Sequence, residues 1–410
     1  MQIGFMTSFE PQFGIGIDIG TSTVKAYLVK NTRFSSDSKL ENQQQSEKTS
    51  QNEIIAEIQE KNSQYLYGKD VISRVMYAHY NGITKLQEAI TFQLNTIIKR
   101  LCQNQEKISS IVITGNTVML SILQGFSLQG FEKHPFKSPS TFGYKIQNPS
   151  IIPNQEIYLT PAISPFLGGD AVSALFHILK TQIYKTEIFQ AQNSQNPQNP
   201  KKQISQTAKE TKDNFQQEKY PFLLLDIGTN GELFLVTQDK IIGTSCAAGP
   251  AFEGENLSRK ITGSTAINYL SKMLQENLID KTGYLQPNTH SPLTQEDIRQ
   301  LQLAKAAIRA GIETLLQETK TQDTQIKKVY ICGNFGNALD TKSLATIGLI
   351  PKSFENKISY QGNAAGFGTI NLLFSSNPQH LTQEITTKTQ VLELGGNPIF
   401  NQHYITHLNF

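Results

Sequence analysis

The chain has 410 residues, with 37 Lys and Arg against 34 Asp and Glu. That length exceeds the size at which one hydrophobic core usually stops growing, so it predicts two domains. The formal net charge of +3 and the lack of any basic block argue against nucleic acid or a membrane surface as a partner, which leaves small molecules and proteins.

The cysteines and histidines argue against a metal or disulfide scaffold. Cys102, Cys246 and Cys332 are far apart, so no Cys-x-x-Cys pair supports a zinc site, an iron–sulfur cluster or a disulfide framework. His403 and His407 stand one helical turn apart without a Glu or Cys companion, which favours an ordinary surface segment over a metal site. With no signal sequence and no run of about 18 apolar residues, we expect a cytoplasmic protein.

Composition divides the chain into segments. Residues 31–62 are rich in Gln, Ser and charge, and residues 186–219 contain repeated Asn-Pro and Gln-Asn pairs. Both stretches are expected to be flexible insertions or linkers. We therefore expect an N-terminal extension over 1–12, a first lobe over 13–185 that includes the first insertion, and a second lobe over 220–410.

The two expected lobes begin with the same motif. Gly16–Thr23 resembles Leu224–Gly231, and each copy contains Asp-Ile-Gly-Thr. In each copy an apolar stretch predicts a strand, the Gly-Thr step predicts a tight turn, and a second apolar stretch predicts the returning strand. The result is two hairpins with Asp18 or Asp226 at the end of the first strand. The expected strands are Phe13–Ile19 and Val24–Val29 in the first lobe, and Phe222–Leu225 and Leu233–Val236 in the second.

Two further strands end in glycine turns, within Ile111–Asn116 and Val329–Gly336. The amphipathic stretch before the second of them predicts a helix that Thr294 caps, with Asp297 in its first turn. Other helices are expected after the first of these turns and after Gly169–Asp170. Strands that alternate with helices, with a hairpin at the start of each half, predict an α/β fold with mixed sheets.

The hairpin turns have the chemistry of a polyphosphate site. Backbone N–H groups in a Gly-Thr turn can converge on an anion, and glycine lets the anion approach the backbone. Asp18 and Asp226 would then lie near the same phosphates, which suits a Mg²⁺ ion, and Lys25 would add a positive charge. One Asp-x-Gly-Thr fits an ordinary hairpin, but two copies in matching context favour nucleotide binding.

Together these features resemble the superfamily of acetate and sugar kinases, heat-shock 70 chaperones and actin. The resemblance implies an actin-like ATPase fold, which is ribonuclease H-like, with two similar lobes and mixed sheets around a nucleotide cleft. It implies catalytic roles for Asp18, Asp226 and Asp170, with Asp18 and Asp226 holding Mg²⁺ through water and Asp170 orienting the attacking water. An Asp at a helix start is equally a plain N-cap.

The same resemblance implies a set of ATP-binding residues. The loops Asp18–Thr23 and Asp226–Glu232 match the two phosphate loops, and Gly333–Gly336 matches the adenosine loop. Lys305 and Arg309, one turn apart on the preceding helix, are expected to reach the base, although a solvated helix face explains them as well. The full set is Gly20, Thr21, Ser22, Thr23, Lys25, Gly228, Thr229, Asn230, Gly231, Glu232, Gly249, Pro250, Lys305, Arg309, Gly333, Asn334, Phe335 and Gly336.

Longer motifs run through nearly the whole chain outside the two insertions. In chain order they are Asn62–Gln64, Tyr67–Val75, Gly115–Met119, Asp226–Glu232, Cys246–Gly254, Ala304–Gly311, Gly333–Gly336, Ile347–Pro351 and Gly362–Gly366. In this order they resemble one branch of the superfamily, namely the ATPase domain of the ATP-dependent reductive activators of corrinoid proteins.

That resemblance implies a function and partners. Such activators use ATP to assist electron transfer from an iron–sulfur centre to a corrinoid that has slipped from Co(I) to Co(II). The implied partner is a corrinoid protein or a corrinoid methyltransferase system, and the implied assembly is a homodimer. The sequence shows no iron–sulfur domain of the family's kind, so we expect no cluster in this chain and a separate ferredoxin-like electron donor.

Two other functions stay open from the sequence. An ATP-dependent binding or chaperone-like switch without a redox role fits the missing cluster domain. A small-molecule kinase fits the superfamily, although no sequence pattern identifies the general base that a kinase needs. Cys246 is expected to be a buried packing residue rather than a redox group.

Overall fold

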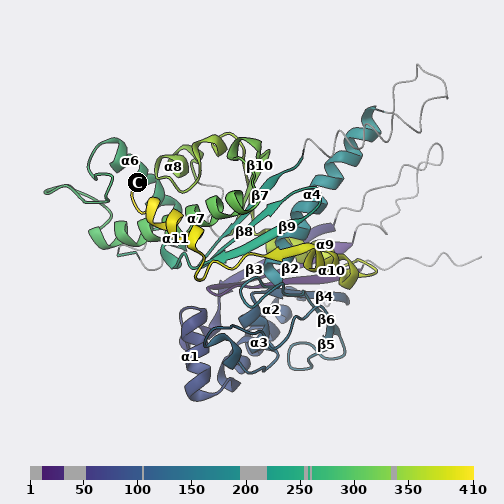
Figure 1. The fold of residues 1–410 in the computed structure, drawn as a ribbon. Coiled ribbons are helices and arrows are strands. Elements are labelled where there is room, and N and C mark those ends of the chain that lie inside the picture. The colour runs from purple at the N-terminus through teal and green to yellow at the C-terminus, as the bar shows by residue number, and fades with distance from the viewer. Residues whose placement is uncertain are drawn as a thin grey trace, which may run out of the picture. The chain divides into compact units, whose positions relative to one another are not determined.

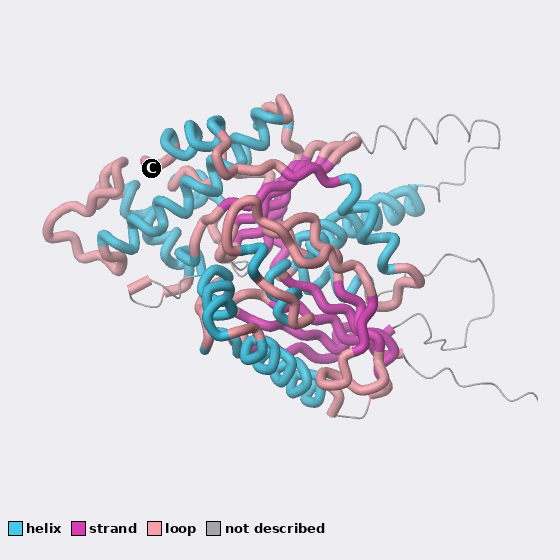
Figure 2. The backbone as a smooth tube through the Cα atoms, turned by 60° about the horizontal axis from the view of Figure 1, so that its bottom comes forward, coloured by secondary structure: helices cyan, strands magenta, loops and turns pink. Residues whose placement is uncertain are grey.

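The computed structural model describes residues 12–31, 52–103, 106–193, 219–253, 257–258, 261–333 and 339–410. It divides the chain into two units, Met1–His177 with Ala365–Glu384 and Ile178–Ala364 with Ile385–Phe410. Each unit contains one six-stranded mixed sheet flanked by helices (Figures 1 and 2). The expected α/β fold with mixed sheets is therefore confirmed.

The sheet of the first unit has the strand order β3-β2-β1-β4-β6-β5. β1 and β2 form an antiparallel hairpin, β3 continues it on one side, and β4 and β6 run parallel to β1 on the other. Ile15, Ile17 and Ile19 of β1 are buried because this strand lies in the middle of the sheet. The strands are β1 (Phe13–Ile19), β2 (Thr23–Asn31), β3 (Asn52–Lys61), β4 (Ile108–Gly115), β5 (Lys145–Gln147) and β6 (Glu156–Leu159).

The sheet of the second unit repeats this plan with the strand order β11-β10-β7-β8-β9-β12. β7 and β8 form the antiparallel hairpin, β9 extends it, and β10 and β11 run parallel to β7. The orders β3-β2-β1-β4-β6 and β9-β8-β7-β10-β11 correspond strand for strand, so the sequence repeat reflects a structural duplication. The strands are β7 (Phe222–Ile227), β8 (Gly231–Val236), β9 (Ile241–Cys246), β10 (Lys328–Cys332), β11 (Ile358–Gly362) and β12 (Thr389–Val391).

Helices bury both faces of the first sheet. On one face α2 and α3 pack Leu86, Ile90 and Leu120 into the core that contains Ile15 and Ile17 of β1. On the other face Ile370 and Leu372 of α9, with Leu373 directly after it, form a second cluster with Tyr27 and Val112. The helices of this unit are α1 (Val71–Asn81), α2 (Thr84–Leu101), α3 (Thr117–Leu123), and most of α9 (Ala364–Leu372) and α10 (Pro378–Lys388), while α4 (Gly169–Asn193) begins here and continues into the second unit.

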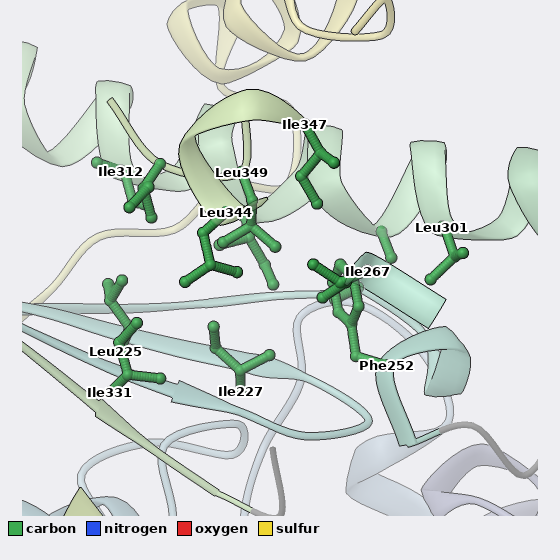
Figure 3. Close-up of a cluster of buried hydrophobic side chains, with 14 of the residues drawn as sticks. Leu225, Ile227, Phe252, Ile267, Leu301, Ile312, Ile331, Leu344, Ile347 and Leu349 are labelled. Carbon is green, nitrogen blue, oxygen red and sulfur yellow. The ribbon is translucent and has the colours of Figure 1, made fainter. Parts of the chain in front are cut away.

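The second core lies between its sheet and α7. Leu225, Ile227 and Ile331 point from the strands toward Leu344, Ile347 and Leu349, and Leu301 and Ile312 of α7 complete the cluster (Figure 3). As expected, Thr294 and Asp297 form a capping box at the start of α7. The helices are α6 (Gly263–Gln275), α7 (Gln295–Glu318), α8 (Thr341–Thr346) and α11 (Pro398–Thr406).

Two expectations about organisation differ from the structure. The expected flexible insertion over 31–62 includes Asn52–Lys61, which form β3, and a buried Asn62. β3 is an edge strand with a largely exposed side-chain pattern, so its polar composition suits its place in the sheet. Residues 365–384, expected in the second lobe, belong to the first unit because α9 packs on β2 and β4.

None of the helices in the described part of the chain is long and apolar enough to cross a lipid bilayer.

Candidate nucleotide-binding site

The expected first phosphate loop, Asp18–Thr23, comprises the end of β1, the turn Gly20–Ser22 and the first residue of β2. Asp18 is half-buried near the end of β1, and its Cα partner across the hairpin is Lys25 of β2. Residues directly opposite in an antiparallel pair have neighbouring side chains on one face of the sheet. The structure thus brings Asp18, Lys25 and the Gly20–Ser22 turn together, as the sequence predicts.

Three polar residues from other parts of the first unit form hydrogen bonds to this turn. Asn62 donates from Nδ2 to the Gly20 carbonyl oxygen at 2.8 Å, and its backbone N–H donates to the Ser22 carbonyl oxygen at 2.8 Å. Arg74 donates from Nη2 to the Thr21 carbonyl oxygen at 2.7 Å. Asn116 donates from Nδ2 to Thr21 Oγ1 at 3.0 Å. The carbonyls of three successive turn residues are therefore fixed.

No role for these three residues is predicted from the sequence. The sequence marks these residues only through the motifs that resemble the corrinoid-protein activators. Those motifs contain Asn62, Arg74 and Asn116. Their partners in the turn are 42 to 95 residues away in the sequence, so the contacts depend on the tertiary fold.

Asp170 lies at the start of α4, next to the same region of the first unit. Its Oδ1 accepts the backbone N–H of Ala171 at 2.8 Å, which is local helix-start chemistry. The preceding Gly168 lies so close to Asn116 that an added Cβ would come 2.5 Å from the Asn116 Cα. The segment before Asp170 therefore packs against the residue that holds Thr21, and the catalytic role of Asp170 stays a prediction.

The expected second phosphate loop, Asp226–Glu232, comprises the end of β7, the turn 228–230 and the start of β8. The Gly228 N–H donates to the Asn230 carbonyl oxygen at 2.9 Å and closes the turn. Asp226 and Glu232 are Cα partners across the hairpin, and both are half-buried. This arrangement matches the first hairpin, in which Asp18 faces Lys25.

A glycine stands at the end of β4 in the first unit and directly after β10 in the second. An added Cβ at Gly115, the last residue of β4, would come 2.7 Å from the Ile19 carbonyl oxygen. The equivalent Gly333, after β10, has a φ of +98°, and an added Cβ would come 3.0 Å from Asp226 Oδ1. A side chain at either position would push into the strand that carries the aspartate of its phosphate loop.

The expected adenosine-binding residues are only partly described. Gly333 has the position just given, whereas Asn334, Phe335 and Gly336 lie outside the described residues. Gly249 has a φ of +77°, and Pro250 begins a short 3-10 helix, Pro250–Glu253. For Gly249, Pro250 and Gly333 the structure therefore shows where the backbone lies.

Lys305 and Arg309 of α7 are engaged in contacts within the second unit. Lys305 is 1% exposed, and its Nζ donates to the carbonyl oxygens of His407 at 2.7 Å and Asn409 at 2.6 Å. Arg309 donates from Nε to Glu313 Oε1 at 2.8 Å. In this structure Lys305 anchors the C-terminal segment, and its approach to a nucleotide base stays a prediction.

Two of the three thiols, those of Cys246 and Cys332, are buried in the second unit. Burial raises the pKa of Cys246 to about 12, and it raises the pKa of Cys332 well above the ordinary value. Cys246 packs in the core of the second unit and donates to the Gly231 carbonyl oxygen at 3.4 Å. Among the described residues no group of three or more His, Cys, Asp or Glu side chains gathers as metal ligands.

Two family models match successive parts of the chain. A model described as the C-terminal domain of RACo, the ASKHA domain, matches residues 221–259 and 288–410. A model of the RACo middle region matches residues 48–186.

Individual relatives agree with these matches. The corrinoid activation enzyme RamQ of Eubacterium limosum is 25% identical over 485 residues, which cover 100% of this chain and 72% of RamQ. The [Co(II) methylated amine-specific corrinoid protein] reductase of Methanosarcina barkeri is 21% identical over 422 residues, which cover 84% of this chain and 71% of the reductase. The solved structure of a reductive activator for a corrinoid, iron–sulfur protein aligns with a TM-score of 0.77 and 24% identity, covering 99% of this chain and 67% of the activator.

The duplicated sheets, each with an Asp-Ile-Gly-Thr hairpin, define the chain as a protein of the ASKHA class. Within that class it combines the RACo middle region with the RACo ASKHA domain. The chain belongs to the RACo family, which confirms the resemblance seen in the sequence motifs.

Proposed function

We propose that this chain is an ATP-dependent reductive activator of a corrinoid protein, which it returns from Co(II) to Co(I). The observation that carries the proposal is the joint match of the RACo middle region and the RACo ASKHA domain to one chain. The names of the two curated relatives support it, because both act on corrinoid proteins or their Co(II) form.

ATP is the proposed nucleotide, and the first hairpin fits a phosphate group. Its turn carbonyls are bound from the protein side, so the turn offers N–H groups rather than carbonyl oxygens to an anion. We propose that Gly20, Thr21, Ser22, Thr23 and Lys25 bind phosphate here. The proposed partners in the second hairpin are Gly228, Thr229, Asn230, Gly231 and Glu232.

The carboxylates define the proposed metal and water positions. Asp18 and Asp226 are half-buried at equivalent strand ends, and one or two carboxylates are the usual protein share of a Mg²⁺ site that also uses water and phosphate oxygens. Bound Mg²⁺ neutralises charge on the phosphates. We propose that Asp18 and Asp226 hold Mg²⁺ through water, and that Asp170 orients the water that attacks the γ-phosphate.

The electron is proposed to come from a separate ferredoxin-like protein. Cobalt gains one electron in going from Co(II) to Co(I), and the donor's iron–sulfur centre loses one. An uphill one-electron step of roughly 250 mV needs about 6 kcal/mol, which ATP-driven conformational change can supply. The chain has three cysteines, fewer than the four thiolates that hold a usual iron–sulfur cluster, which supports a separate donor. We also propose a homodimer as the working assembly.

The test is an absorbance assay of cobalt reduction. The purified chain is mixed with ATP, Mg²⁺, a reduced low-potential ferredoxin and a methylamine-specific corrinoid protein in the Co(II) state. We expect Co(I) absorbance to appear only when both ATP and ferredoxin are present. ADP release without ATP-dependent Co(I) would contradict the reductive role and favour a nucleotide-dependent switch. No ADP release and no nucleotide binding would contradict the ATPase assignment itself.

A further inference from the structure

Arg74 is a buried cation behind the first phosphate loop. It lies in the first turns of α1, which Asp70 caps through a capping box with Ser73. Its side chain is 0% exposed and is among the largest fully buried side chains of the described residues. An arginine in such a position must satisfy its donors within the protein.

Its hydrogen bonds all end on uncharged acceptors. Nε donates to the Gly68 carbonyl oxygen at 3.0 Å, and Nη1 contacts Gln64 Oε1 at 3.2 Å and Met119 Sδ at 2.9 Å. Nη2 donates to the Thr21 carbonyl oxygen at 2.7 Å. Burial lowers the pKa of Arg74 to about 10, although Asp70 raises it, so the group stays charged at neutral pH. Its charge is therefore buried without a carboxylate among these hydrogen-bond partners.

This contact determines the direction of a peptide group in the loop. In a trans peptide the C=O and the following N–H point in opposite directions. Because Arg74 holds the Thr21 carbonyl oxygen toward the interior, the Ser22 N–H points away from the guanidinium. Asn62 acts in the same way on the Gly20 carbonyl, and therefore on the Thr21 N–H.

We propose that Arg74 is a positioning residue for phosphate binding: it orients the Thr21–Ser22 peptide so that the Ser22 N–H faces the nucleotide, and it places a positive charge behind that peptide. The inference rests on the proposed ATP binding at this hairpin. A buried charge is costly, and an apolar side chain of similar size would fill the same space at lower cost. The charge-assisted bond to the loop gives Arg74 a function beyond packing.

Calorimetric titration with ATP tests this role. Arg74→Met keeps the length of the side chain but removes the charge and the donors, and we expect ATP affinity to fall about 10- to 100-fold, the effect of losing one charged hydrogen bond. Arg74→Lys keeps the charge but not the fork of donors, so we expect an intermediate loss. The matched control is Arg100→Met, because Arg100 is half-exposed and pairs with Glu60 at the surface.

The binding stoichiometry separates positioning from a general structural role. If Arg74 only supported folding, a variant would bind fewer equivalents of ATP at unchanged affinity. A positioning role predicts weaker affinity at unchanged stoichiometry, and wild-type affinity in a folded Arg74→Met would overturn the inference. Absence of ATP binding in the wild type would instead contradict the proposed function.

A measurement on the wild type covers the case in which the Arg74 variants do not fold. Hydrogen exchange of the Ser22 amide is measured with and without ATP. We expect ATP to slow this exchange about tenfold or more, because the N–H then contacts a phosphate oxygen. Unchanged exchange of the Ser22 amide under conditions where ATP is bound would overturn the inference.

Discussion

At the scale of single residues, Lys305 and Arg74 show how the chain uses buried cations. Each donates to backbone carbonyl oxygens from elsewhere in its own unit. For Lys305 the acceptors belong to the C-terminal segment, and the Phe410 ring lies 5.2 Å from its Nζ. Burial, together with the nearby Arg309, lowers the pKa of Lys305 to about 8. The hydrogen bonds of Lys305 hold the C-terminal segment in place, but burying the charged ammonium group costs free energy.

The lowered pKa of Lys305 predicts a pH dependence of stability. Between pH 8 and the ordinary lysine value of 10.5, the unfolded chain holds this proton and the folded chain loses it. Folding stability therefore rises with pH in this window, by about 3 kcal/mol at most. Lys305→Met should lack this contribution, so the melting temperature of the wild type relative to the variant should increase from pH 7.5 to pH 9.5.

The control for Lys305 is a lysine at the surface of the same unit. Lys272 is 67% exposed, so Lys272→Met should keep the wild-type pH dependence. If the melting temperatures of the wild type and Lys305→Met change identically with pH, the Lys305 proton does not contribute to the pH dependence of stability.

The residues that bind the turn of the first hairpin illustrate a limit of sequence reasoning. Asp18 and Asp226 could be identified because each stands in a short motif that forms its own hairpin. Asn62 and Arg74 lie 42 and 53 positions from the carbonyls that they bind, so nothing local reveals the contact. A motif can mark such residues as important without telling what they touch.

At the scale of elements, the hairpins were predictable and the edge strand was not. Both Asp-Ile-Gly-Thr hairpins follow from apolar runs separated by a Gly-Thr turn. β3 carries Glu and Gln at exposed positions, a composition that also suits a linker, and only its pairing with β2 identifies it as a strand. The pairing of β3 with β2, which ends 21 residues before β3 begins, cannot be derived from periodicity alone.

The turn after β10 gives a prediction at this scale. Gly333→Ala would require a side chain at a φ of +98° and would bring its Cβ close to Asp226 Oδ1 and the Ile227 carbonyl oxygen. We expect the second phosphate loop to shift, with ATP turnover at least tenfold lower and unfolding stability reduced by about 1–2 kcal/mol. Turnover is measured as ADP release, and stability by urea unfolding.

The control for Gly333 is Gly395, where an added Cβ meets nothing within 4 Å. Gly395→Ala should leave turnover and stability at wild-type values. Wild-type turnover in Gly333→Ala would mean that the backbone after β10 does not set the position of Asp226.

At the scale of the whole molecule, the duplication explains both the success and the error of the domain prediction. The same strand plan appears twice, so a repeat found in eight residues correctly predicted two similar units. The error concerns residues 365–384, which follow the second sheet in sequence but fold with the first. The order of the sequence places this segment after the second sheet, whereas the apolar side chains of α9 are buried against β2 and β4 of the first sheet.

The duplication also yields a prediction about the two aspartates. If one nucleotide–metal complex uses both hairpins, Asp18→Asn and Asp226→Asn should each lower the ATP hydrolysis rate by about 100-fold or more. The double variant should be no slower than the slower single variant, because groups that act as a unit lose their function together. Independent sites would instead give losses that multiply. ADP release from the three variants, with circular dichroism to verify folding, distinguishes these results, and Asp239→Asn in the exposed β8–β9 turn is the control that should leave the rate unchanged.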